Sequence, residues 1–113
     1  MTERELAAEM LAALATSNVD RVRELTAADV VLFGTDEGER WDDRRSLLDA
    51  LEEMRSLGLT AAWADDVREG QGWVAGTAIY RLADGSQLPT RVSLVFVDGR
   101  LVHGHFSVVR EGE

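Results

Sequence analysis

The spacing of apolar residues predicts two helices at the start of the chain. Thr2 and Glu5 form a capping-box pattern, and the apolar residues after them recur every three to four positions, which predicts a helix over residues 3–16. The pattern then breaks, and Asn18 can cap a short second helix. The apolar positions of that second helix are Val19, Val22 and Leu25.

A strand and a third helix are predicted next. Residues 29–33 are rich in β-favouring side chains, which indicates a short strand. The third helix is expected over residues 43–57, with Asp42 or Asp43 as its cap and Gly58 in a left-handed conformation at its end. Its apolar positions are Leu47, Leu48, Leu51 and Met54.

In the second half of the chain, short β-favouring runs alternate with turns that contain glycine. The predicted strands cover residues 59–68, 73–82, 88–97 and 100–109. Because their connections are short, neighbouring strands are expected to be antiparallel and to form a meander. Helices followed by such a meander predict a single α+β domain over residues 1–113.

The last predicted hairpin has two alternative registers. If Asp98 and Gly99 form a two-residue turn, Val97 pairs with Arg100, and Arg91 falls among apolar residues. If the loop has three residues, the pairing shifts by one position. We prefer the three-residue loop, with a left-handed glycine, because it separates polar from apolar side chains.

In the preferred register, Phe96 pairs with Arg100, Arg91 faces His105, and Ser93 faces His103. One face of the hairpin then carries Val92, Leu94, Phe96, Val102, Phe106 and Val108. The other face carries Arg91, Ser93, Val95, Leu101, His103, His105 and Ser107. An arginine and two histidines are therefore predicted to share one surface of the sheet.

Composition excludes several classes of function. The 113 residues include 21 acids, 12 arginines, no lysine and no cysteine, for a net charge of -9. The lack of cysteine excludes thiol catalysis and thiolate metal sites, and the lack of lysine excludes Schiff-base chemistry. The negative charge argues against a nucleic-acid partner, because such binding relies on neutralising phosphates.

The sequence also predicts where the protein resides. No apolar run approaches the roughly 18 residues of a membrane span, and residues 1–5 are acidic where a secretory signal is basic. We therefore expect a cytoplasmic protein with no membrane partner. No cofactor is predicted.

Two motifs resemble a known family. Residues 33–41 read Phe-Gly-Thr-Asp-Glu-Gly-Glu-Arg-Trp and resemble the Phe-Gly-Thr-Asp-x-x-Glu-x-Trp signature of SnoaL-like proteins, in the nuclear transport factor 2-like superfamily. Residues 98–108, which include His-Gly-His-Phe-Ser, resemble the last hairpin of the same family. Arg91 also lies where that family usually has an arginine.

The resemblance implies a strongly curved antiparallel sheet that wraps around the N-terminal helices, forming a cone with a pocket, and commonly a homodimer. The superfamily includes ketosteroid isomerase, polyketide cyclases, dehydratases and members with no known reaction. The catalytic carboxylates of the isomerase have no counterpart around Phe33, Gly34 or Val92.

Arg91, His103 and His105 are the leading candidates for a ligand site. A guanidinium beside two imidazoles would offer hydrogen-bond donors to a carboxylate or a similar small anion. In the structural alternative, Arg91 pairs with Asp36 or Glu39 and the histidines only hydrogen-bond within the sheet. The residue types favour neither alternative, whereas the family resemblance favours the pocket.

Asp36 and Glu39 lie in the loop before the third helix. Either could act as a general base facing His105, although bracing the loop is the commoner role for such acids. The spacing of His103 and His105 would also allow a metal site with one of these acids, but His-x-His is an unspecific pattern and no metal is predicted.

Trp41, Trp63 and Tyr80 are candidates for the wall of a pocket that takes a ring-bearing ligand. Core or dimer contacts are the alternative role for such aromatic residues.

The leading hypothesis is a small-molecule-binding protein that recognises a partly apolar ligand, such as a carboxylate, through Arg91, His103 and His105. The first alternative is an enzyme of the isomerase, cyclase or dehydratase type, in which His105 or Asp36 moves a proton. The second is a structural dimerisation module.

Overall fold

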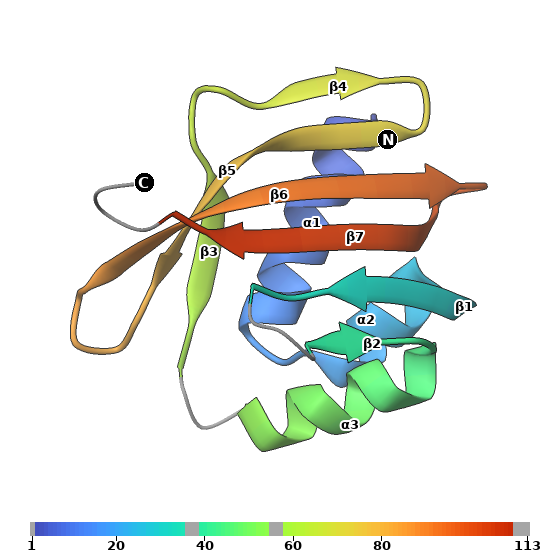
Figure 1. The fold of residues 1–113 in the computed structure, drawn as a ribbon, viewed down its shortest axis with the longest axis horizontal. Coiled ribbons are helices and arrows are strands. Elements are labelled where there is room, and N and C mark those ends of the chain that lie inside the picture. Colours follow the sequence, from blue (N-terminus) through green and yellow to red (C-terminus); the bar gives the residue numbers. More distant parts are fainter. Residues whose placement is uncertain (1, 36–38, 55–57, 110–113) are drawn as a thin grey trace.

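The computed structural model describes residues 2–35, 39–54 and 58–109, which form three helices and a seven-stranded sheet (Figure 1). The helices are α1 (Glu3–Ala15), α2 (Val19–Leu25) and α3 (Arg44–Met54). The strands are β1 (Thr26–Phe33), β2 (Arg40–Trp41), β3 (Thr60–Trp63), β4 (Arg68–Gly70), β5 (Trp73–Arg81), β6 (Gln87–Val97) and β7 (Arg100–Val108). The predicted α+β class is confirmed.

Side-chain caps begin the three helices close to where the sequence predicts them. Backbone N–H groups of Glu5, Arg21 and Ser46 donate to side-chain oxygens of Thr2, Asn18 and Asp43, respectively, at 3.1, 3.2 and 2.8 Å. Each bond satisfies an N-terminal donor that has no partner within its helix. Asp43 is thus the side chain that caps α3. Gly58 has the predicted positive φ, 63°, whereas residues 55–57 and the Met54 side chain lie outside the described part of the chain.

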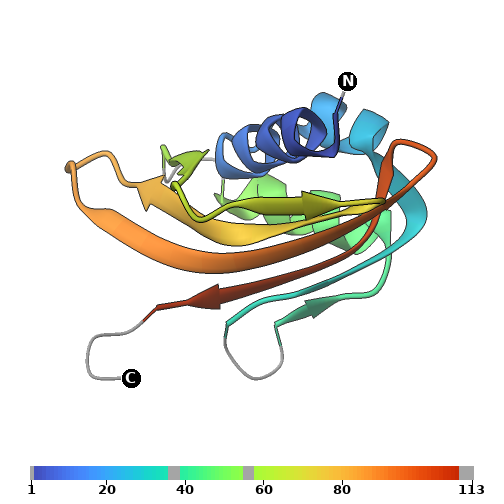
Figure 2. The same cartoon turned by 90° about the horizontal axis from the view of Figure 1, so that it is seen from above.

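The sheet has the strand order β2-β1-β7-β6-β5-β3, and β4 also pairs with β5. Strands β5, β6 and β7 form the predicted antiparallel meander. Strand β1 pairs with β7 in parallel, so the sheet is mixed and not wholly antiparallel as expected. The sheet is curved, and the three helices lie on its concave side (Figure 2). We call the helix-covered side the inner face and the opposite side the outer face.

The strand predicted over residues 59–68 is divided into β3 and β4. Between them, Asp66 accepts hydrogen bonds from the backbone N–H and the hydroxyl of Thr77, at 2.9 and 2.7 Å. Val67 turns inward and is buried against Gly76, where a Cβ atom would lie 2.7 Å from the Val67 Cα. Between β3 and β4, the hydrogen bonds of Asp66 with Thr77 and the buried Val67 side chain therefore replace regular backbone pairing with β5.

The β6–β7 hairpin has neither of the two predicted registers over its whole length. Asp98 and Gly99 form a two-residue turn with φ of 53° and 77°, and Val97 pairs with Arg100. The predicted three-residue loop is wrong, because both turn residues adopt the positive φ that a tight hairpin turn requires. The left-handed conformation of Gly99 is confirmed.

A β-bulge then shifts the register of β7 by one residue. Phe96 pairs with Leu101 but Val95 pairs with His103, so Val102 is the extra residue. Leu101, just before the bulge, pairs with the inward-facing Phe96 and is fully buried on the inner face. Beyond the bulge, polar and apolar side chains separate between the faces as predicted.

The core lies between the inner face and the helices. Its fully buried members include Met10 and Leu11 of α1, Leu32 of β1, Leu94 of β6 and Leu101 of β7. Among the described helices, none is long and apolar enough to cross a membrane.

The pairing of Phe96 with Leu101 predicts different costs for two neighbouring substitutions. Leu101→Ala should lower the free energy of unfolding by about 2–5 kcal/mol, because it leaves a cavity in the core. Val102→Ala should cost about 1 kcal/mol or less, because that side chain is only half-buried. Urea denaturation of both variants measures the difference, and a larger cost for Val102→Ala would contradict the pairing of Phe96 with Leu101.

Candidate functional site

An apolar hollow of about 360 Å³ lies on the inner face, between the sheet and the ends of α1 and α3. It is lined by Leu14, Ala15, Leu32, Gly34, Thr35, Glu39, Trp41, Leu47, Ala50, Leu51, Leu59, Tyr80, Leu88, Thr90, Phe106 and Val108. Most of these side chains are aliphatic or aromatic. The hollow has the composition that is typical of sites for small organic molecules.

The two threonine hydroxyls of the hollow are used within the protein. Thr35 Oγ1 accepts a hydrogen bond from the backbone N–H of Val108 at 2.8 Å and lies 3.4 Å from the carbonyl oxygen of Phe106. Thr90 Oγ1 donates to the carbonyl oxygen of Leu88 at 3.3 Å. These contacts tie the loop after β1 to β7 and stiffen the wall of the hollow.

Tyr80, Glu39 and the indole of Trp41 supply further polar side-chain groups of the lining. Tyr80 comes from β5 opposite Leu88, is half-buried, and packs against the core. Its hydroxyl makes no hydrogen bond to any described residue. The Glu39 side chain lies over Gly34, where a Cβ atom would come within 3.0 Å of the Glu39 carboxylate. Within the part of the chain that the structure describes, the hollow thus holds one phenol and one carboxyl group.

The phenol of Tyr80 is a hydrogen-bond donor over the whole physiological pH range. Burial raises its pKa to about 12, because the apolar surroundings disfavour the charged phenolate. A neutral phenol can donate a hydrogen bond to a carbonyl or hydroxyl oxygen of a bound molecule.

The predicted site residues do not form one cluster. Trp41 and Tyr80 line the hollow, as expected for wall residues. Trp63 packs against the core outside this lining, and its Nε1 atom is buried without a partner among the described residues. Asp36 lies outside the part of the chain that the structure describes.

Arg91, His103 and His105 lie on the outer face, with exposed side chains. The expectation that these three residues share a hollow with Trp41 and Tyr80 is therefore wrong. They alternate with Val92, Leu94 and Phe106, which point toward the helices, and alternation along a strand sends neighbours to opposite faces. Their roles in binding stay predictions.

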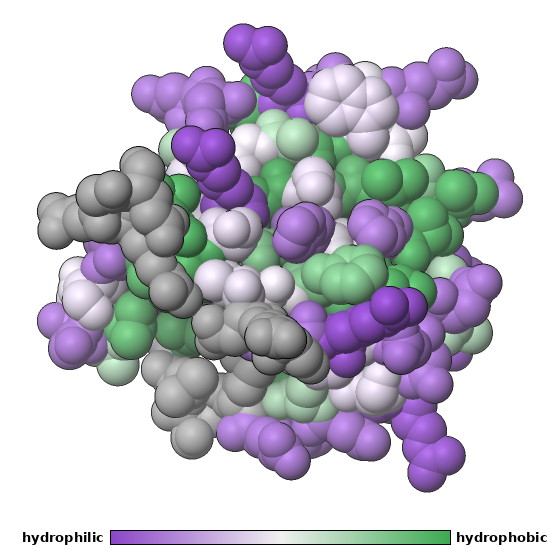
Figure 3. Space-filling model, in the orientation of Figure 1, coloured by the Kyte–Doolittle hydropathy of each residue, from purple (hydrophilic) through white to green (hydrophobic). Residues whose placement is uncertain are grey.

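The two histidines gather around Phe33 on the outer face. Ring centroids of His103 and His105 lie 5.5 and 6.0 Å from that of Phe33, and the Arg40 guanidinium lies 5.0 Å from it. In Figure 3 hydrophilic side chains occupy the middle of this face, and hydrophobic ones gather toward the β6–β7 turn. Among the described residues, no group of three His, Asp or Glu side chains could hold a metal ion.

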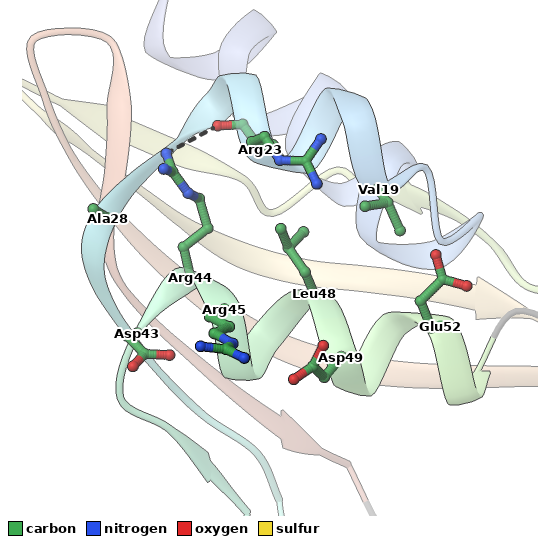
Figure 4. A pocket seen from close by; sticks show the side chains of 9 residues that line it. All are labelled: Val19, Arg23, Ala28, Asp43, Arg44, Arg45, Leu48, Asp49 and Glu52. Carbon is green, nitrogen blue, oxygen red and sulfur yellow. Dashed lines mark hydrogen bonds between the residues drawn. The ribbon is translucent and has the colours of Figure 1, made fainter.

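A second hollow, of about 520 Å³, lies between α2 and α3 (Figure 4). Arg44 reaches across it and donates to the backbone carbonyls of Arg23 and Thr26, at 3.4 and 3.2 Å. Arg23 lies in the last turn of α2, where carbonyls lack partners within the helix, and Thr26 is the first residue of β1. Three arginines and three acids line this crevice together, and Arg44 serves to join the helices, so the apolar hollow is the better candidate site.

Sequence reasoning missed which face of the sheet bounds the hollow. Phe106 and Val108 were assigned to the apolar face of the last hairpin, and both line the hollow. The signal was the apolar stripe of the third helix, at Leu47 and Leu51, which must be buried against an apolar sheet face.

Comparisons with known proteins agree with this architecture. A family model described as a SnoaL-like domain matches residues 4–111. No curated protein matches the chain.

Solved structures with similar folds come from several bacteria. A candidate ketosteroid isomerase from Kribbella flavida has a TM-score of 0.81 at 21% identity, and the match covers 97% of this chain and 79% of that one. A candidate isomerase of the SnoaL-like family from Agrobacterium tumefaciens has a TM-score of 0.80 at 13% identity, with coverage of 97% and 100%. An LEH-like epoxide hydrolase from M. tuberculosis has a TM-score of 0.78 at 17% identity, with coverage of 94% and 81%. At these identities the likeness shows the fold.

The environment of Tyr80 can be measured directly, because it is the chain's one tyrosine. In a pH titration, the tyrosinate absorbance should appear with a midpoint at about pH 12, above the ordinary tyrosine pKa of about 10. Folding raises this pKa. The free energy of unfolding therefore keeps the contribution of the neutral phenol below about pH 10 and loses it as the pH rises toward 12. A midpoint near 10 while circular dichroism still shows folded protein would contradict a buried phenol.

Proposed function

Because the chain belongs to the SnoaL-like domain family, we propose that it binds a small, largely apolar molecule in the hollow between the sheet and the helices. The single observation that carries this proposal is the lining, which is mostly apolar and contains the Tyr80 hydroxyl as a neutral donor. The volume of about 360 Å³ is near the lower end of the ~300–1000 Å³ that is typical of such pockets.

The lining favours a neutral ligand over the carboxylate expected from the sequence. Among the described residues, no arginine or histidine lines the hollow, and Glu39 contributes a carboxyl group of its own. A carboxylate ligand would lose its hydration there without gaining a cationic partner, which is costly in an apolar site. Arg91, which was expected to pair with it, lies on the opposite face of the sheet.

A neutral ligand with one carbonyl or hydroxyl oxygen suits the polar groups that are present. Tyr80 would donate to that oxygen, and the Trp41 ring would pack against the apolar part of the molecule. The remaining aliphatic lining would recognise size and shape.

The shared lining of Tyr80 and Glu39 favours a second candidate function, a proton transfer on a carbonyl compound. Glu39 would accept a proton from the carbon beside the carbonyl group and return it at another position, while Tyr80 donates a hydrogen bond to the carbonyl oxygen. The names of the two neighbours described as candidate isomerases are consistent with this chemistry. A proton transfer by His105, the alternative that the sequence suggested, would have to take place on the outer face of the sheet.

The homodimer, the cytoplasmic location and the purely structural role stay predictions.

Binding is tested with two probes of one skeleton, 2-acetylnaphthalene and 2-naphthoate. We expect the ketone to raise the melting temperature and to bind at least about tenfold more tightly than the carboxylate. Tyr80→Phe should weaken ketone binding by ~5- to 10-fold, because it removes one hydrogen bond. Isothermal titration calorimetry measures both effects.

Two further variants act as controls. His103→Ala removes an exposed imidazole on the outer face and should leave ketone binding unchanged. Ala50→Trp fills the hollow and should abolish binding in a protein whose circular dichroism is unaltered. Tighter binding of the carboxylate, or loss of ketone binding in His103→Ala alone, would overturn the proposal.

The proton-transfer candidate has its own measurement. In D2O, the protein should exchange the methyl protons of 2-acetylnaphthalene for deuterium faster than buffer does, as followed by proton NMR. Glu39→Gln should abolish this acceleration while ketone binding is kept. Acceleration that is equal in the wild type and in Glu39→Gln would exclude Glu39 as the base.

A further inference from the structure

A bay of about 390 Å³ lies on the outer face and is lined by residues of β5, β6 and β7, three strands that lie side by side in Figure 1. It is lined by Asp66, Ala75, Gly76, Thr77, Arg91, Val92, Ser93, His105 and Ser107. Its lining shares no residue with that of the apolar hollow, so the sheet separates the two.

The strand register surrounds Arg91 with hydrogen-bonding side chains. Arg91 pairs directly with Thr77 on β5 and with Ser107 on β7. Ser93 follows two residues later on the same face and pairs with His105, which is therefore a diagonal neighbour of Arg91. Thr77 already donates its hydroxyl proton to Asp66, whereas the side chains of Ser93, His105 and Ser107 can donate to one small group placed beside Arg91.

Small side chains make room for such a group. Ala75 and Ser93 are paired across β5 and β6, and Ser107 lies beside Arg91 on β7. The next pair on the same face of the two strands is the larger Trp73 and Val95.

The charge at this place differs from that of the whole chain. The net charge is -9, yet strands β5, β6 and β7 contain no acidic residue. Asp66 is the acid in the lining, and both of its carboxylate oxygens accept hydrogen bonds from Thr77. Arg91 is exposed and forms no ion pair within 4 Å with any described acid.

Asp66 and Arg91 still influence one another. The hydrogen bonds from Thr77, with a smaller contribution from the Arg91 charge, lower the pKa of the Asp66 carboxyl group. Asp66 therefore stays ionised and bound to Thr77 near neutral pH. It partly offsets the Arg91 charge, but it leaves the guanidinium donors of Arg91 available.

We propose that this bay binds a small oxyanion, a carboxylate or a phosphate group, with Arg91 as its cationic partner and Ser93, His105 and Ser107 as further donors. A guanidinium presents paired N–H groups that match the oxygens of both anions, which is the chemistry they share. The site is independent of the apolar hollow, so the protein would carry a neutral ligand on one face of the sheet and an anion on the other.

The experiment titrates the protein with acetate and, separately, with inorganic phosphate at constant ionic strength, and follows backbone amides by NMR. We expect saturable shifts at Thr77, Ser93, His105 and Ser107, and the anion that saturates at the lower concentration identifies the preferred class. Arg91→Gln should weaken binding at least tenfold. Arg81→Gln removes the same charge from an exposed position on β5 outside the bay and should change binding by less than twofold.

Three results would overturn the proposal. One is the absence of saturable shifts with either anion. Another is an equal loss in Arg91→Gln and Arg81→Gln, which would show that only overall charge matters. The third is a shift of the same amides with protein concentration alone, which would assign this face to contact between two copies of the chain.

Discussion

The chemistry of this protein depends on a sheet that is covered by helices on one face only. Along each strand, alternate side chains point to the inner and outer faces, so a shift of one residue would exchange the two sets. The extra residue Val102 in β7 corrects the register that the two-residue turn at Asp98 and Gly99 would impose. Without this bulge, Arg91 would lie opposite Phe106, and polar and apolar side chains would mix on both faces.

The bulge separates two different environments. On the inner face, Phe106 joins Tyr80 in an apolar hollow where a charged ligand would lack a partner. On the outer face, Arg91 and His105 lie in water beside serine hydroxyls. A neutral molecule and an anion therefore find suitable surroundings on opposite sides of the same three strands. The SnoaL-like fold supplies the curved frame, and the side chains of this sequence supply the two kinds of lining.

Local features of the fold could be predicted from the sequence, because each depends on a few neighbouring residues. The caps at Thr2, Asn18 and Asp43 are examples. The parallel pairing of β1 with β7 depends on strands far apart in sequence, and the sequence pattern did not indicate it. The division of β3 from β4 depends on a bond between Asp66 and Thr77, which is likewise a tertiary contact.

The candidate site could be predicted only in part, because its position also depends on tertiary contacts. Alternation correctly grouped Arg91 with the two histidines, and side-chain type correctly placed Trp41 and Tyr80 in a wall. Which group faces the hollow depends on where the helices pack, which the apolar stripe of the third helix indicates and the hairpin sequence alone does not. The most direct test of this two-faced arrangement is a set of intermolecular NOEs from bound 2-acetylnaphthalene. We expect NOEs to the Leu51 methyl groups and the Phe106 ring, whereas NOEs to the rings of His103 and His105 would contradict the account.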